Sequence, residues 1–236
     1  MLIIVLLPIM KIPGKMTPPI KREIKKLLCF LLPLMALLGA LLSNPLKANT
    51  VIDTATDALA AERAKLLNGE IIVTISDLPD GVTGVRGDIY IAAPPKKVWE
   101  VITDYNNHKK FVPNITDSGW ITNTGDEKVM FEAGTSGMLF FRKSVYIKMK
   151  VWGEEFKTLY FQQITGDFKT YKGDWTLVDY PERAGTFLTF RAEVKPGFFA
   201  PPFAVRNVQR RDCPQVLTAM KKQAELPVSA EPQKKG

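Results

Sequence analysis

The sequence has few of the residues on which most catalytic and metal sites depend. Among its 236 residues there is one histidine, His108, and there are two cysteines, Cys29 and Cys213. Structural zinc needs four ligands at characteristic spacing, and this set cannot supply them. A glycine-rich phosphate loop and a Gly-x-Ser-x-Gly nucleophile motif are also missing. We therefore expect no catalytic residue, no metal and no cofactor, and we place His108 in an exposed polar loop.

Acidic residues are scarce at the start of the chain. Residues 1–48 hold 7 of the 32 Lys and Arg residues but only 1 of the 24 Asp and Glu residues. The remainder has 25 basic and 23 acidic residues, a formal charge of +2, whereas the whole chain carries +8. Binding to a nucleic acid backbone needs a concentrated positive face, which a nearly neutral remainder does not supply. This distribution argues against nucleic acid as a partner.

The leading segment has the layout of an export signal. A basic stretch at residues 21–26 precedes 16 uncharged residues, 27–42, and a short polar region ends near Ala48. A membrane-spanning helix needs roughly 20 apolar residues, so this run is short. We expect residues 1–48 to be a cleaved signal peptide and the protein to be periplasmic or extracytoplasmic. An uncleaved N-terminal membrane anchor is the alternative.

The remaining chain reads as one domain with a short helix before it. Residues 49–69 have a weakly apolar helical face and end at Asn68-Gly69, a typical helix stop. Residues 70–226 contain short segments of alternating apolar and polar residues, the clearest being 145–152. Their short connections favour antiparallel pairing. The polar residues 227–236 are expected to be a disordered tail.

A helix start follows directly behind a predicted strand at residues 93–105. Pro94 and Pro95 stop the strand, and proline is tolerated in the first turn of a helix. Val98, Val101 and Ile102 then recur at the spacing of one helical face. The stretch closes on Asp-Tyr.

Four motifs in this order resemble the START-like (SRPBCC) superfamily. They are residues 93–105, the Gly-x-Phe and Gly-x-Trp pattern within 166–175, the strand 186–190, and the amphipathic basic helix 210–222. The superfamily includes the polyketide cyclase/dehydrase and coenzyme-Q-binding branches and the birch-pollen-allergen helix-grip fold. The resemblance covers residues 69–226. It implies a helix held by a curved antiparallel sheet around an apolar cavity.

We therefore predict an α+β fold in which about seven antiparallel strands wrap around a long C-terminal helix. Pro214 lies inside that helix, where we expect a kink or a restart. Alternation along the strands and the stripe on the helix predict the residues that face the cavity. They are Ile147, Met149, Val151, Trp175, Leu177, Leu188, Phe190, Val208, Leu217 and Met220.

A bent sheet and one helix cannot fill the space between them, which favours binding of a hydrophobic small molecule or lipid. The resemblance and the export signal suggest the quinone, lipid or isoprenoid class. A cyclase or aromatase-type enzyme acting on a polyketide-like substrate is one alternative, with Tyr105, Gln163 and Asp174 as its weak candidate groups. A protein-interaction module is another. The sequence leaves the oligomeric state open.

One end of the predicted sheet gathers large apolar residues in its loops. Loops are normally polar, so this end is a candidate rim for docking on a membrane surface, with basic residues meeting anionic headgroups. The alternative is that these side chains fold back and plug the cavity. The rim consists of Met138, Leu139, Phe140, Phe141, Arg142, Lys143, Phe168, Phe198 and Phe199.

Overall fold

The computed structural model describes residues 57–125, 127–138 and 141–227, without the side chains of residues 127, 138, 141 and 142. The predicted signal peptide and most of the predicted tail lie outside the described residues. The chain divides into two units, residues 1–59 and 60–236, and the fold below is that of the second. Among the described residues, no helix is long and apolar enough to cross a membrane.

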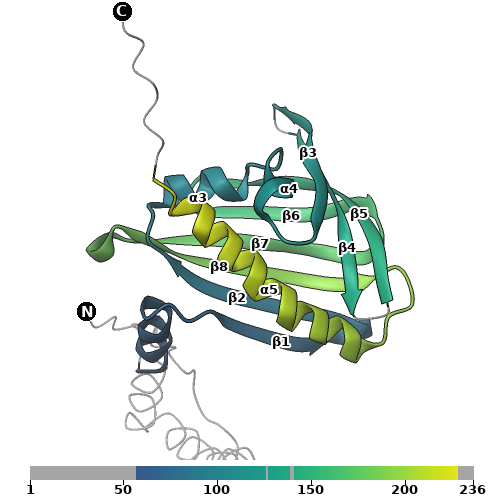
Figure 1. The fold of residues 1–236 in the computed structure, drawn as a ribbon, viewed down its shortest axis with the longest axis horizontal. Helices are drawn as coiled ribbons and strands as arrows, with labels where there is room; N and C mark the ends of the chain where they lie inside the picture. The colour runs from purple at the N-terminus through teal and green to yellow at the C-terminus, as the bar shows by residue number, and fades with distance from the viewer. Residues whose placement is uncertain (1–56, 126, 139–140, 228–236) are drawn as a thin grey trace, which may run out of the picture. The chain divides into compact units, whose positions relative to one another are not determined.

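The core of the fold is one antiparallel sheet of eight strands, where the sequence predicts about seven (Figure 1). Its spatial order is β1-β2-β8-β7-β6-β5-β4-β3, so a single long connection, from β2 to β3, leaves the meander. The strands are β1 (Ile72–Leu78), β2 (Val82–Ile91), β3 (Ile115–Thr124), β4 (Glu127–Met138), β5 (Phe141–Glu154), β6 (Thr158–Gly166), β7 (Phe168–Tyr180) and β8 (Gly185–Pro196). Two short 3-10 turns, η1 (Pro79–Gly81) and η2 (Pro181–Arg183), join β1 to β2 and β7 to β8.

Besides the helical residues 57–67 that precede β1, the described part of the chain has three helices. Within the connection from β2 to β3 lie α3 (Pro95–Ile102) and α4 (His108–Phe111), and the chain ends in α5 (Pro202–Ala224). Figure 1 shows α5 running across one face of the sheet, and α5 packs on β1, β2, β4 and α3. This arrangement confirms the predicted α+β fold with its long C-terminal helix.

Helix α5 continues through Pro214 without the restart that the sequence suggests. Proline removes one backbone donor and disturbs the preceding turn. The buried side of the helix, which includes Cys213 and Leu217, packs against the rest of the core on both sides of this position. That packing holds the helix together across the missing hydrogen bond.

The predicted strand register is confirmed in β5. Ile147, Met149 and Val151 are buried, whereas Lys150 is exposed. Trp175, Leu177, Leu188, Val194, Leu217 and Met220 belong to the same core. Alternation therefore places one side of each strand against α5.

The opposite face of the sheet is covered at one place. Phe187 and Tyr90 point away from α5 but are each only 8% exposed, because Leu66 and Tyr180 pack on them. Leu66 belongs to the helical residues that precede β1. This small second cluster closes the outer face near the ends of β2 and β8.

Candidate ligand-binding site

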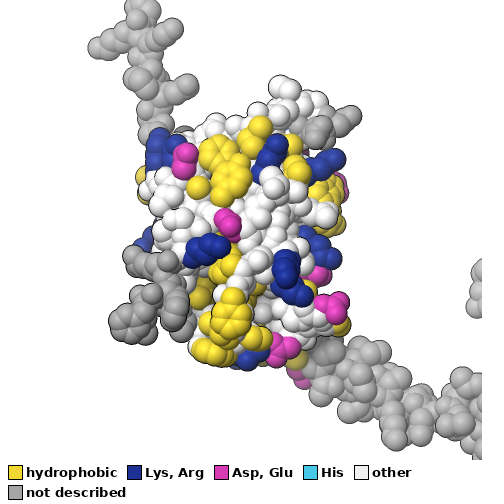
Figure 2. Space-filling model, turned by 90° about the vertical axis from the view of Figure 1, so that its right-hand side faces the viewer, with side chains coloured by type: hydrophobic (Ala, Val, Ile, Leu, Met, Phe, Trp, Pro, Cys, Tyr) yellow, Lys and Arg dark blue, Asp and Glu magenta, His cyan; other side chains and the backbone are white. Residues whose placement is uncertain are grey.

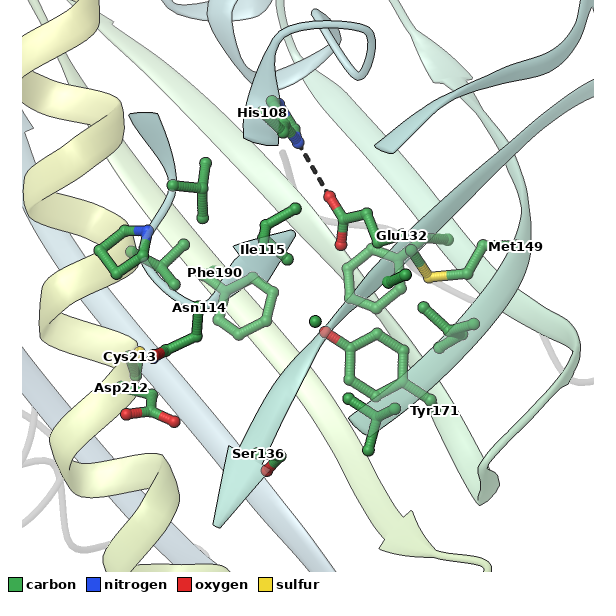
Figure 3. A pocket seen from close by; sticks show the side chains of 18 of the residues that line it. His108, Asn114, Ile115, Glu132, Ser136, Met149, Tyr171, Phe190, Asp212 and Cys213 are labelled. Carbon is green, nitrogen blue, oxygen red and sulfur yellow. Dashed lines mark hydrogen bonds and ion pairs between the residues drawn. The ribbon is translucent and has the colours of Figure 1, made fainter. Parts of the chain in front are cut away.

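A cavity of about 220 Å³ lies between the sheet and α5. Its walls come from β3 to β8, from α5, and from the connection that contains α3 and α4 (Figure 3). Ligand pockets usually measure roughly 300–1,000 Å³, so this one suits a small ligand or opens further around a larger one.

Six of the ten predicted cavity residues line it: Ile147, Met149, Trp175, Phe190, Leu217 and Met220. The other four, Val151, Leu177, Leu188 and Val208, are not among the described lining residues. Val151, Leu177 and Leu188 share the inward side of the sheet but lie where other core side chains fill the space. Val208 is half-buried on α5.

A pair of a buried histidine and a half-buried carboxylate stands in the cavity wall. His108 in α4 is 3% exposed, so the expectation of an exposed loop residue is wrong. Its Nδ1 lies 2.9 Å from Oε1 of Glu132 in β4, and its Nε2 lies 3.1 Å from the carbonyl oxygen of Val101 (Figure 3). Tyr105 and Phe111 pack on the imidazole ring at centroid distances of 4.9 and 5.5 Å. These contacts fold the polar connection back over the sheet.

The hydrogen-bond partners of His108 restrict the protonation states of the pair. A carbonyl oxygen only accepts, so Nε2 must carry a hydrogen and donate to Val101. Nδ1 faces a carboxyl oxygen, so one proton lies between the two groups, on either Nδ1 or Oε1. The pair has no net charge in either case. Oε2 of Glu132 is left as a hydrogen-bond acceptor in both.

Two phenols, Tyr105 and Tyr171, share the cavity with Glu132. Burial raises the pKa of both hydroxyls, and the nearby Glu132 raises each pKa further, so both stay protonated. No hydrogen bond joins either hydroxyl to a protein group in the part of the chain that the structure describes. Figure 3 shows Tyr171 and Glu132 on one side of the cavity, across from Asp212 on α5. The two phenols and Oε2 of Glu132 thus offer two donors and one acceptor to an occupant.

Cys213 also lines the cavity but is not a nucleophile. Burial, followed by the charge of Asp88, raises the pKa of its thiol to about 12. The thiolate is the reactive form, and almost none is present near neutral pH. Cys213 therefore acts as a small apolar group in the wall.

The three candidate groups for an enzyme do not come together. Tyr105 lines the cavity, but Asp174 pairs with Arg191 at 3.0 Å on the other side of the sheet. Gln163 donates from Nε2 to the carbonyl oxygen of Phe168 at 2.7 Å, and its buried Oε1 has no partner among the described residues. Neither Gln163 nor Asp174 is among the described lining residues.

Glu132 and the role of His108 were not predicted from the sequence. One signal was available for Glu132, since it alternates in phase with Met130, a buried residue of β4. A carboxylate on the inward side of a strand indicates a specific partner. His108 stands between asparagines and lysines, and its partners are 24 and 7 positions away, so no local pattern points to its burial.

The predicted docking rim is only partly described. Phe168 turns inward and packs on Tyr171 at a centroid distance of 5.2 Å, and Phe198 is half-buried with the Nζ of Lys143 4.0 Å from its ring centroid. Phe199 is 94% exposed, and its neighbour Phe203 is 58% exposed. The remaining rim residues, 138–142, lie outside the described residues or lack described side chains.

A family model described as polyketide cyclase / dehydrase and lipid transport matches residues 91–221, more than half of the chain. No curated protein sequence matches.

Solved structures share the fold at low sequence identity. The Zhui aromatase/cyclase from Streptomyces sp. R1128 is 17% identical, with a TM-score of 0.54 over 63% of this chain and 97% of that one. A STAR-related lipid transfer protein from Xanthomonas axonopodis is 15% identical, with a TM-score of 0.50 over 65% and 99%. A START superfamily protein from Mycobacterium smegmatis is 14% identical, with a TM-score of 0.51 over 60% and 97%. These likenesses establish the START helix-grip fold and nothing finer.

Proposed function

Because the chain belongs to the polyketide cyclase/dehydrase and lipid transport family, we propose that it binds a hydrophobic small molecule or lipid, of the quinone, lipid or isoprenoid class, in the cavity under α5. The observation that carries the proposal is the cavity itself. Its apolar walls are built from side chains of the six strands β3 to β8 and of α5, and the hydroxyls of Tyr105 and Tyr171, which have no protein partner among the described residues, add polar groups to the lining. Apolar walls with a few placed polar groups are typical of ligand sites.

Filling the cavity tests this proposal. Val145 lines the cavity, and the larger side chain of Val145→Phe would occupy part of it. The variant should bind 2-methylnaphthalene, a hydrocarbon probe, at least about ten-fold more weakly, which corresponds to a loss of about 1.4 kcal/mol of binding free energy. Val178→Phe makes the same change on an exposed position of β7 and should leave binding unchanged. Isothermal titration calorimetry measures both. No binding to the wild type, or equal binding to both variants, would contradict the proposal.

A cyclase-type enzyme is the second candidate, and the His108–Glu132 pair favours it. A carboxyl group that shares a proton with a histidine is a group from which general acid–base catalysis can be built. Turnover of a poly-β-ketone by the wild type, abolished in Glu132→Gln, would support the enzyme. In that variant the side-chain amide can still donate to Nδ1 of His108, so the fold is kept while the carboxyl proton is removed.

Delivery of the ligand at a membrane surface is the second part of the proposal. Phe199 and Phe203 supply exposed aromatic area, and Figure 2 shows hydrophobic side chains interspersed with Lys and Arg on this end of the molecule. Aromatic insertion with basic contacts to anionic lipid supports peripheral binding. Anionic vesicles should sediment the wild type but not Phe199→Asp, whereas Val178→Asp, a matched change on β7, should sediment normally. Equal sedimentation of all three proteins would remove the membrane step.

We further propose that the protein is exported and works on the extracytoplasmic side of such a membrane. We expect cleavage after about Ala48, because the basic, apolar and polar regions follow one another in the order of a signal peptide. Cell fractionation with N-terminal sequencing measures this. A cytoplasmic protein that retains residues 16–42 would contradict it.

A further inference from the structure

The charges around the cavity restrict the kind of ligand that it accepts. None of the described residues that line it is Lys or Arg. An anionic headgroup in this space would lose its hydration without gaining a cationic partner, which costs several kcal/mol for a buried ion. The lining also contains Asp212, whose carboxylate is held by Arg211 at 2.6 Å.

A cationic ligand is also disfavoured, because both carboxyl groups of the described lining, Glu132 and Asp212, already have partners. Glu132, whose side chain is 20% exposed, is the one carboxyl on the sheet side of the cavity among the described lining residues, and it already shares a proton with His108. The pair has no net charge, so it offers little attraction to an ammonium group. Breaking the pair to accommodate one would leave a buried imidazolium without its partner.

The remaining polar groups suit an uncharged oxygen. The hydroxyls of Tyr105 and Tyr171 stay protonated and can donate, and Oε2 of Glu132 can only accept. A ligand hydroxyl can accept from a phenol and donate to this carboxyl oxygen, and a ligand carbonyl can accept from both phenols.

We propose that the cavity selects an uncharged hydrophobic molecule that carries a hydroxyl or carbonyl oxygen, which lies between Tyr105, Tyr171 and Glu132. His108 is a positioning residue that holds Glu132 against this oxygen. The inference rests on the proposed function, since it names the chemical class of ligand for the same cavity. A cavity of this kind does not accept a fatty acid, a phospholipid or an amine with its charged group inside the cavity.

Four probes with the same aromatic ring test the selectivity. They are 2-naphthalenemethanol, 2-methylnaphthalene, 2-naphthoate and 2-naphthylmethylammonium, titrated into the wild-type protein by calorimetry at neutral pH. The alcohol should bind about three- to ten-fold more tightly than the hydrocarbon, as expected for a net hydrogen bond. The alcohol should bind at least about thirty-fold more tightly than either ion, because an unpaired buried charge costs several kcal/mol.

Variants locate the selectivity in the cavity. Tyr171→Phe should abolish the advantage of the alcohol over the hydrocarbon, and Tyr160→Phe, which removes an exposed hydroxyl from β6, should not. Ser136 lines the cavity, and Ser136→Lys should admit 2-naphthoate, whereas the uncharged Ser136→Met should not.

Two outcomes separate this inference from the proposed function. Binding of either ion within three-fold of the alcohol, or an equal loss of alcohol and hydrocarbon in Tyr171→Phe, would overturn the selectivity and leave the cavity as a ligand site. If none of the four probes binds, the proposed function is wrong and the inference falls with it.

Discussion

The part of the core around α3 is filled, whereas the part between α4 and the middle of α5 encloses a cavity. Both parts follow one construction rule, in which alternating strand residues face a helix. Around α3, the side chains of Ile89, Ile91, Val98 and Leu188 are at most 2% exposed and none lines the cavity. Near α4, the wall instead includes a buried histidine, a carboxyl group and two phenols.

The difference indicates that the filled part of the core stabilises the fold, whereas the part with the cavity gives up packing contacts so that a ligand can bind. Protein interiors normally pack to the density of organic crystals, and buried polar groups normally find partners. The filled part obeys both rules. In the cavity part, space is left open and the hydroxyls of Tyr105 and Tyr171 have no protein partner among the described residues, so an occupant would complete both the packing and the hydrogen bonding. Three predictions test this contrast, in order of expected effect.

Shortening a side chain should cost more in the filled part. Leu188 is 0% exposed, and Leu188→Ala should lower the free energy of unfolding by about 3–5 kcal/mol, since it removes contacts and leaves a new void. Ile147 borders existing empty space, and Ile147→Ala should cost about 1–2 kcal/mol because it has fewer contacts to lose. Urea denaturation measures both values. Equal losses at the two positions would show that the cavity is filled in the folded protein.

The buried thiol of Cys213 in the cavity wall should make the free energy of unfolding fall at alkaline pH. The pKa of Cys213 is raised in the folded state, so the unfolded chain loses this proton first as the pH rises. The protonated thiol therefore contributes fully to the free energy of unfolding below its pKa in the unfolded chain, near 9. This contribution is lost as the pH rises towards the pKa of about 12 in the folded protein, at up to about 1.4 kcal/mol per pH unit.

Cys213→Ala should flatten that part of the stability profile, measured by denaturation from pH 8 to 11. Thr176→Ala, at a half-buried residue on the other side of the sheet that does not titrate, serves as the control and should keep the slope of the wild type. An unchanged slope in Cys213→Ala would place the thiol in water rather than in an apolar wall.

The smallest of the three expected effects on stability comes from removing a tyrosine hydroxyl, and it should differ between the closed outer cluster and the cavity. Tyr90 belongs to the closed cluster on the outer face and donates to the carbonyl oxygen of Arg183 at 3.1 Å, so Tyr90→Phe should cost about 1 kcal/mol. Tyr105 has no such partner among the described residues, so Tyr105→Phe should leave the thermal midpoint nearly unchanged. A comparable loss in Tyr105→Phe would mean that its hydroxyl serves the fold and not a ligand.

The sequence predicted the filled part better than the cavity. Alternation in β5 and β8 and the apolar face of α3 depend on local spacing, so residues such as Val151, Leu188 and Val98 could be placed in the core directly. Whether an inward-facing residue borders the cavity or packs in the filled core depends on how closely β7, β8 and α3 approach one another, which local spacing does not determine. This is why Leu177 and Leu188 were predicted to line the cavity although neither is among its described lining residues.

The polar side of the cavity was the least predictable part. Glu132 and His108 are 24 positions apart and meet only because the connection from β2 to β3 folds back over β4. The family resemblance gave the helix-grip fold correctly, since the order of motifs reflects the order of elements. It contained no information on these two residues, because the contents of the cavity differ among proteins of one fold.

The most direct test is native mass spectrometry of the protein purified from its own cells without detergent. We predict one bound molecule per chain, uncharged, rich in carbon and carrying at least one hydroxyl or carbonyl oxygen. The Val145→Phe variant should lack it, and Val178→Phe should retain it. A bound anionic lipid, the same molecule in Val145→Phe, or no bound molecule in the wild type would contradict the account.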